Sequence, residues 1–180
     1  MITQRTKKLA YFAIFLALSF VLPFVVHLSV QQGGRVLLPM HIPIQLAGFI
    51  LSPTAALVLG IIAPPFNFLV SGMPPFPHFI PMMFELGAMG FLIGILRRKL
   101  SIIPTLLVAI VVSKLFLALG WIVVLSFGLA PNVFKRGVFV IVSSALVTGL
   151  PGIIAQLILI PPLVSLMRKG ATGKQGEHGI

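Results

Sequence analysis

The sequence predicts an all-α integral membrane protein, a compact bundle of six transmembrane helices with both termini in the cytoplasm. The first observation is composition: of 180 residues, 58% are hydrophobic and only 8% are charged, against about 25% charged residues in a soluble domain. The second is a mean hydropathy of +1.16. So few charges cannot cover a water-facing surface, which excludes a soluble enzyme, an isolated nucleic-acid-binding domain and a disordered chain.

Basic residues strongly outnumber acidic ones, and cysteine is absent. Thirteen Lys and Arg stand against two acids, which gives a formal charge of +11. We expect no nucleic-acid partner, because no soluble basic domain exists to bind one. The basic residues instead flank spans, where they set the topology in the membrane. Without cysteine, a disulfide framework, a thiolate nucleophile and a cysteine-ligated metal are excluded.

The first span is an apolar run over residues 9–30, preceded by basic residues. This run exceeds the apolar core of a signal peptide, about 7–15 residues, and lacks an A-x-A cleavage site. We therefore expect it to be retained as a membrane helix. Residues 31–39, QQGGRVLLP, then form a polar loop.

The second span, residues 40–51, is short. Such a helix reaches about 18 Å, less than the roughly 30 Å of the hydrocarbon core, so neighbouring segments must shield it. The third span, residues 54–70, is expected to break at Pro64-Pro65, before a proline-rich turn over residues 71–77. Irregular backbone at membrane depth is tolerated where it lines a cavity. The breaks therefore favour a cavity, although proline is also commoner in membrane helices than in soluble ones.

Three further spans complete the bundle, over residues 78–96, 102–129 and 137–167. We expect residues 1–168 to form a single six-helix membrane domain. Residues 169–180 are rich in glycine and polar residues, and we expect them to form a flexible C-terminal tail.

The basic residues are distributed unevenly between the two sides that six spans define. With both termini in the cytoplasm, the cytoplasmic side receives Arg5, Lys7, Lys8, Arg97, Arg98, Lys99, Arg168, Lys169 and Lys174. The outer side receives only Arg35, Lys135 and Arg136. This bias agrees with the positive-inside rule and predicts the orientation.

Two charged residues, Glu85 and Lys114, fall inside apolar spans. An ionisable group within the membrane is costly and is by default a candidate functional residue. A structural Glu–Lys pair joining two helices is the alternative. Counted from the outer span ends, Glu85 lies about 10–12 Å deep and Lys114 about 22 Å deep, which leaves direct contact open.

Helical spacing places further polar residues beside these two. In the fifth span, Trp121 shares a face with Lys114. One face of the fourth span carries His78, Met82, Glu85 and Met89. The first loop, the second and third spans and the start of the fourth span add the candidate substrate-binding residues Arg35, His41, Gln45, Asn67 and Phe79.

The sequence gives little support for catalysis or metal binding. It contains no aspartate, so no Ser-His-Asp set exists, and its isolated histidines lack ligand spacing. We expect no catalytic residue and no metal. A phosphate-binding G-x-x-x-x-G-K-[ST] motif is also absent. Any uphill transport would therefore need an ATPase on another chain.

Over about residues 8–168 the chain resembles the substrate-binding S components of energy-coupling-factor (ECF) vitamin transporters, in the branch with riboflavin- and pantothenate-type members. The resemblance rests on length, on six spans with both termini inside, and on sequence segments. These segments are the A-x-x-x-A pair Ala13 and Ala17, LLPMHIPIQLAGFILSP (residues 37–53), SGMPP (71–75) and MFELGAMGFLIGILRRK (83–99).

The resemblance implies a function, partners and a location. S components of bacterial plasma membranes bind a vitamin from outside, in a pocket under the outer loops. They associate with a transmembrane coupling protein, which Ala13 and Ala17 would contact, and with two ATPases. These ATPases use ATP, so this chain itself would need no cofactor. Transport in the family is thought to involve toppling of the S component in the membrane.

The substrate is predicted from charge. The outer half is net basic, which favours an anionic or strongly polar ligand: it carries Arg35, Lys114, Lys135 and Arg136 against Glu85. Pantothenate, with one carboxylate and two hydroxyls, ranks first, and riboflavin or cobalamin next. The alternatives are a standalone membrane channel or facilitator, a small intramembrane enzyme, and a purely structural subunit.

Overall fold

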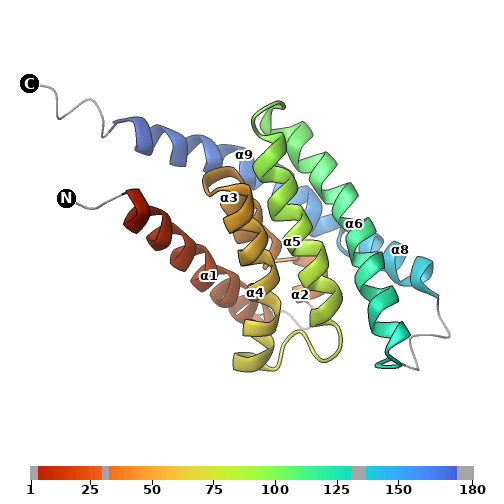
Figure 1. Cartoon of the computed structure of the whole chain (residues 1–180). Helices are drawn as coiled ribbons and strands as arrows, with labels where there is room; N and C mark the ends of the chain where they lie inside the picture. Colours follow the sequence, from red (N-terminus) through yellow and green to blue (C-terminus); the bar gives the residue numbers. More distant parts are fainter. Residues whose placement is uncertain (1–3, 30–32, 131–136, 174–180) are drawn as a thin grey trace, which may run out of the picture.

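The computed structural model describes residues 4–29, 33–130 and 137–173, and helices are the regular structure throughout these residues (Figure 1). The helices are α1 (Gln4–Ser29), α2 (Gly33–Leu37), α3 (His41–Ile50), α4 (Pro53–Ser71), α5 (Phe79–Leu96), α6 (Ile102–Ser126), α8 (Val138–Thr148) and α9 (Leu150–Gly173). The all-α prediction is confirmed.

Five helices are long and apolar enough to cross a membrane: α1, α4, α5, α6 and α9. They correspond to five of the six predicted spans. The remaining predicted span is α3, which at ten residues reaches only about 15 Å. Most of its residues are buried, so neighbouring helices shield it as expected. The count of six crossings remains a prediction.

Helix α5 lies between α4 and α6, and α3 packs against it (Figure 1). Glycines allow the close approach of α4 and α5. A Cβ atom at Gly60 would collide with the backbone carbonyl of Leu86, and one at Gly90 would lie 2.7 Å from the carbonyl oxygen of Ala56. Small residues at helix contacts are the usual means of close packing in lipid.

Helix α4 is unbroken, which makes the predicted break at Pro64-Pro65 wrong. Proline removes a backbone donor but has a φ angle that suits a helix, and membrane helices tolerate it where neighbours satisfy the freed groups. Helix α4 instead ends at Ser71, and Gly72, which follows it, adopts a φ of 71°. The irregular backbone is therefore confined to the connection between α4 and α5.

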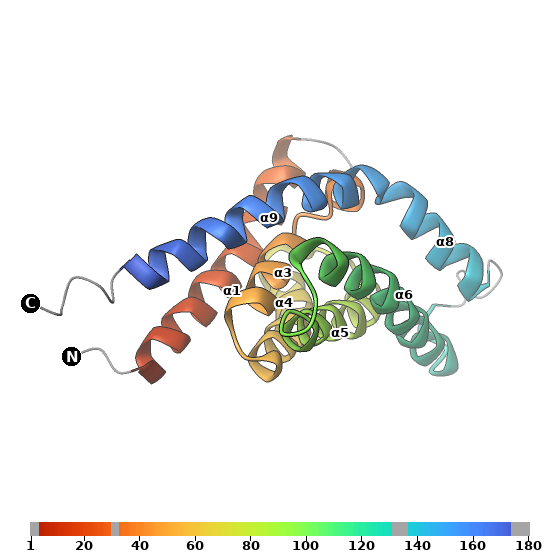
Figure 2. The ribbon, with the colours of Figure 1, turned by 90° about the horizontal axis from the view of Figure 1, so that it is seen from above.

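The predicted sixth span is two helices, α8 and α9, which meet at Gly149 and change direction there (Figure 2). Pro151 lies two residues after Gly149 and cannot donate a helical hydrogen bond. The predicted fifth span also ends earlier than expected, at Ser126. Helix α9 continues to Gly173, and residues 174–180 of the predicted tail lie outside the described residues.

The two sides of the bundle are distinct in Figure 1. The start of α1, the α3–α4 and α5–α6 connections and the end of α9 lie toward one side, above in this view. The α4–α5 connection and the end of α6 lie toward the other. We call the first side the basic end, after Arg97–Lys99, and the second the aromatic end, after Phe76 and Phe79. This arrangement agrees with the predicted alternation, whereas which side is cytoplasmic remains a prediction.

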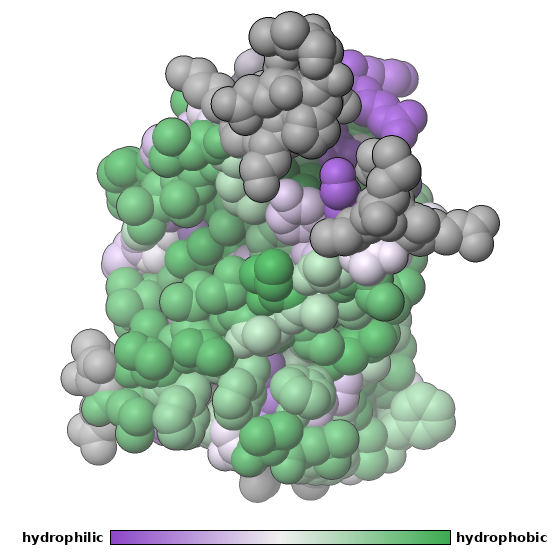
Figure 3. All heavy atoms as spheres, turned by 90° about the vertical axis from the view of Figure 1, so that its left-hand side faces the viewer, coloured by the Kyte–Doolittle hydropathy of each residue, from purple (hydrophilic) through white to green (hydrophobic). Residues whose placement is uncertain are grey.

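The surface of the bundle is largely apolar, as the space-filling view of one face shows (Figure 3). Large side chains stand exposed on α1, α6 and α8, including Leu28 at 73%, Leu115 at 69% and Phe139 at 83%. Exposure on this scale is incompatible with water but is expected for surfaces that face lipid tails. The polar side chains described next are, by contrast, buried.

Candidate functional site

A buried polar cluster lies in the interior, formed by His41 of α3, Glu85 of α5 and Lys114 of α6. The Lys114 ammonium forms an ion pair with Glu85 Oε1, and His41 Nε2 lies 3.4 Å from the same oxygen. The two charged residues therefore contact directly. The long lysine side chain spans part of the expected difference in depth between Lys114 and Glu85. The rest of the difference is smaller than predicted, because α6 ends at Ser126 and Lys114 is therefore nearer the end of its helix.

Two glutamines extend the cluster toward α9. Gln45 Nε2 donates to Gln156 Oε1 over 2.7 Å and approaches Met89 Sδ at 3.4 Å. Gln156 Nε2 in turn approaches the backbone carbonyl of Leu38, in the connection between α2 and α3, at 3.5 Å. Gln156 is not among the residues predicted from the sequence, although an isolated glutamine in an apolar run is visible without a structure.

Two acceptor atoms in this cluster have no hydrogen-bond partner among the described residues: His41 Nδ1 and Gln45 Oε1. Their side chains are 3% and 0% exposed, and they lie one turn apart on α3. With the ring hydrogen placed on His41 Nε2, toward the carboxylate, Nδ1 is an acceptor. A buried unpaired acceptor costs about 1–3 kcal/mol. Both atoms are therefore suited to accept from a hydroxyl or an N–H group.

An aromatic group lies toward the aromatic end. The ring centroids of His78 and Trp121 are 5.1 Å apart in an edge arrangement, and Phe79 stacks on Phe68 at 4.8 Å. Trp121 is buried, whereas His78 and Phe79 are half-buried. Such rings can pack against the apolar part of a ligand. The predicted shared helix face of Trp121 and Lys114 thus joins the aromatic group to the buried polar cluster.

Two other predicted substrate-binding residues, Asn67 and Arg35, are not placed in the buried polar cluster by the structure. The Asn67 amide donates to the carbonyl of Ser19 on α1 at 3.0 Å and to that of Ala63 on α4 at 2.9 Å. These contacts join two helices and lie outside the cluster. Arg35 lies in α2, and its side chain is outside what the structure describes.

Ala13 and Ala17 both lie exposed on α1, while Phe15 and Ser19 of the same helix are buried against the bundle. Their small side chains leave a shallow apolar surface open to a partner helix. Little of α1 is buried by the rest of the chain.

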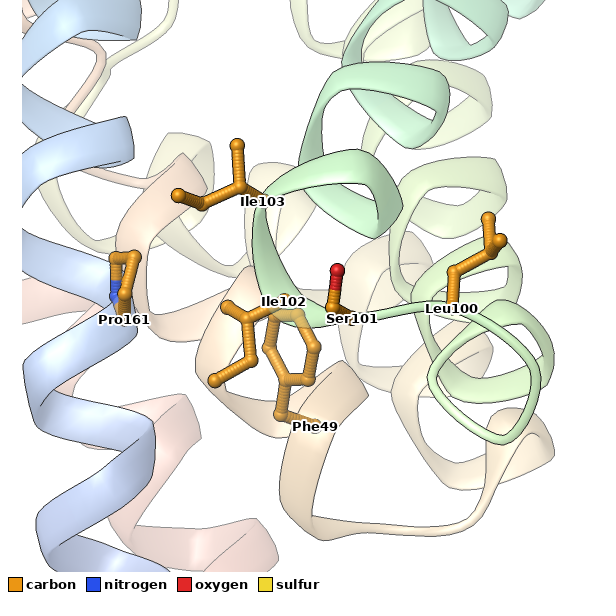
Figure 4. A pocket seen from close by; sticks show the side chains of 6 residues that line it. All are labelled: Phe49, Leu100, Ser101, Ile102, Ile103 and Pro161. Atoms are coloured by element: carbon orange, nitrogen blue, oxygen red, sulfur yellow. The ribbon is translucent and has the colours of Figure 1, made fainter.

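A pocket of about 400 Å³ opens at the basic end (Figure 4). Phe49, Leu100, Ser101, Ile102, Ile103 and Pro161 line it. No predicted substrate-binding residue is among them. This pocket is therefore separate from the buried polar cluster. Within the described ranges, no group of three or more His, Cys, Asp or Glu lies close enough together to hold a metal ion.

Comparison with protein families gives one match over most of the chain. A family model described as ECF transporter, substrate-specific component, matches residues 7–164. Neither the curated proteins nor the solved structures include a match to this chain.

Proposed function

This chain belongs to the family of substrate-specific components of ECF transporters, and we propose that it captures a vitamin or vitamin precursor from outside the cell. Members of this family are binding subunits of transporters and not enzymes, and the chain is a multi-pass protein of the cell membrane. The family also implies a small-molecule substrate and partner coupling and ATPase subunits. In our proposal one coupling protein and two ATPases receive the loaded subunit, and ATP is used by those partners alone.

The observation that carries the proposed site is the pair of unpartnered acceptors, His41 Nδ1 and Gln45 Oε1, beside the Glu85–Lys114 ion pair. Buried polar groups in membrane proteins are expensive and are usually paired. Two acceptors left over in the same place suggest that a ligand with hydroxyl or N–H donors completes them. In our proposal Lys114 binds a carboxylate or carbonyl oxygen of that ligand.

The aromatic group would complete the site. Trp121, Phe79 and His78 would pack against the ligand between the aromatic end and the cluster, and Arg35 remains a predicted substrate-binding residue. We assign Asn67 to the packing of α1 on α4, because its amide donates to carbonyls of both helices. Pantothenate remains the first candidate, because its carboxylate suits Lys114 and its hydroxyls suit the two acceptors. Riboflavin and cobalamin follow.

Calorimetry on the purified protein with pantothenate, riboflavin and cobalamin tests this function. We expect one of these vitamins to bind, and to raise the free energy of unfolding by about 2.7 kcal/mol at a hundredfold excess over Kd. Gln45→Leu/Gln156→Leu is expected to weaken binding tenfold or more. Since both partners of the Gln45–Gln156 hydrogen bond become apolar, the free energy of unfolding of this double variant should stay near that of the wild type.

Ser143→Ala, in α8, is the matched control and should bind normally, because the Ser143 hydroxyl donates to the Val140 carbonyl of its own helix. Wild-type affinity in the double glutamine variant would exclude the proposed site. Failure of well-folded wild-type protein to bind any of the three vitamins would count against the proposed substrates. Ion flux through liposomes containing only this chain would then favour a channel.

A second prediction concerns the surface around Ala13 and Ala17. Ala17→Val should leave vitamin affinity unchanged but reduce uptake by cells at least tenfold, because added bulk prevents close approach of a coupling-protein helix. Leu28→Val, at another exposed position of α1 (73% exposed), is the control and should transport normally. Co-purification with the coupling protein is the direct measurement. Normal assembly of the Ala17→Val variant would remove this surface from the proposed interface.

A further inference from the structure

The pocket at the basic end is apolar except for Ser101. Phe49, at the end of α3, forms one wall, and Pro161 of α9 forms another (Figure 4). Leu100 and the first-turn residues Ile102 and Ile103 of α6 complete the apolar lining. Its volume of about 400 Å³ is in the range of small-molecule sites, about 300–1,000 Å³. A soluble anion alone would gain nothing from such walls, whereas an acyl chain would.

Positive charge lies beside this apolar pocket. Arg98 and Lys99 are exposed, and they directly precede the lining residues Leu100 and Ser101. Consecutive Cα atoms are about 3.8 Å apart, so both cations are within side-chain reach of the pocket. Arg97 differs from these two, since its guanidinium donates to the backbone carbonyls of Phe49 and Leu51. It thereby fixes the wall of the pocket and leaves its two neighbours to face outward.

The start of α6 adds hydrogen-bond donors at the same place. Ser101 is the N-cap residue, and its hydroxyl makes no capping hydrogen bond (Figure 4). The backbone N–H groups of Ile102 and Ile103 belong to the first turn, where a helix provides no internal acceptors. Negative charge is favoured at this end of a helix. The donors, the cations and the apolar walls together fit an amphiphile with an anionic head.

We propose that this pocket binds one anionic phospholipid, with an acyl chain between Phe49, Ile103 and Pro161. The phosphate would lie at Arg98, Lys99 and Ser101. Basic sites between membrane helices are a known means of holding anionic lipid headgroups. The bound lipid would join the start of α6 to α9. This inference is independent of the proposed vitamin site, which lies elsewhere in the bundle.

Thermal unfolding in detergent, combined with native mass spectrometry, tests the proposal. The probes are phosphatidylglycerol and phosphatidylcholine with identical acyl chains. Phosphatidylglycerol should raise the Tm and remain bound to the protein as a single molecule, and phosphatidylcholine should do neither. Ile103→Trp, which fills the pocket, should abolish retention of phosphatidylglycerol. Arg98→Gln/Lys99→Gln should weaken retention at least fivefold without changing the Tm of the lipid-free protein.

The matched control is Lys7→Gln/Lys8→Gln, which removes two exposed cations from α1 and should retain the lipid. Equal retention by the wild type and the Ile103→Trp variant would overturn the pocket, as would equal retention of the two lipids by the wild type. Stabilisation by inorganic phosphate to the same extent would show that no acyl chain is recognised. If Ile103→Trp instead impaired only assembly with the coupling protein, the pocket would be a protein-docking site. Should Ile103→Trp fail to fold, Pro161→Trp replaces it as the variant that fills the pocket. The Arg98→Gln/Lys99→Gln variant still decides the role of the cations.

Discussion

Replacing Lys114 with methionine is expected to destabilise the folded protein by about 3–5 kcal/mol, the usual result of removing one partner of a buried ion pair. The Glu85 carboxylate, buried in the native structure, would lose its ammonium partner and would keep, among the described residues, the contact with His41 Nε2 at 3.4 Å. Equilibrium unfolding of the purified variant in detergent measures the effect. Loss of vitamin binding should accompany it, since the same ammonium is proposed to contact the ligand.

The double variant Glu85→Gln/Lys114→Met separates stability from binding. It removes both charges, and replacing a whole buried pair is often neutral or stabilising. We expect most of the lost stability to return while the vitamin still fails to bind. A double variant as unstable as the single one would show that the charges do not act as a pair. A stable double variant with unchanged affinity would assign the pair to helix packing alone.

The second large effect is expected at Gly60. Gly60→Ala should destabilise the protein by about 3 kcal/mol or more, at or above the upper end of ordinary overpacking. The new Cβ would collide with the Leu86 carbonyl and lie 2.6 Å from the Gly87 amide nitrogen. Both are backbone atoms of α5 that cannot rotate away, so α4 and α5 would have to separate. Unfolding in detergent and the yield of monodisperse protein measure the result.

Gly34 provides the matched control for this prediction. A Cβ at Gly34, in α2, meets nothing within 4 Å. Gly34→Ala should therefore be neutral or stabilising by about 0.5–1 kcal/mol, the difference in helix propensity. Similar melting temperatures for the two alanine variants would contradict close packing of α4 on α5 at Gly60.

Hydropathy predicted the helices well where a long apolar run ended at polar or basic residues. It failed at prolines: one predicted break is absent, and one predicted continuous span is divided into two helices. Pro64-Pro65 does not interrupt α4, while the backbone changes direction near Pro151. The sequence identifies the missing N–H donor in each case, but whether a helix continues depends on packing by distant segments. Such contacts cannot be deduced from one chain.

The sequence predicted individual polar residues of the candidate site better than it predicted which of them contact one another. Glu85 and Lys114 were found because charge within a span is conspicuous, and the structure pairs them. That His41 joins them could not be predicted, since α3 is too short to be placed by counting turns from a membrane surface. Gln156 contacts Gln45 across 111 residues of sequence, and no local pattern indicates such a partner.

The exposure of α1 determines what holds a partner against it. Few residues of this helix pack on its own chain, and Ala13, Ala17 and the larger Leu28 all face outward. Lipid tails are as apolar as a partner's side chains, so association there replaces one apolar neighbour with another. It gains no hydrophobic free energy from the exclusion of water. Contact at α1 therefore depends on steric fit and on the freedom regained by displaced lipids, which makes it reversible and sensitive to bilayer composition.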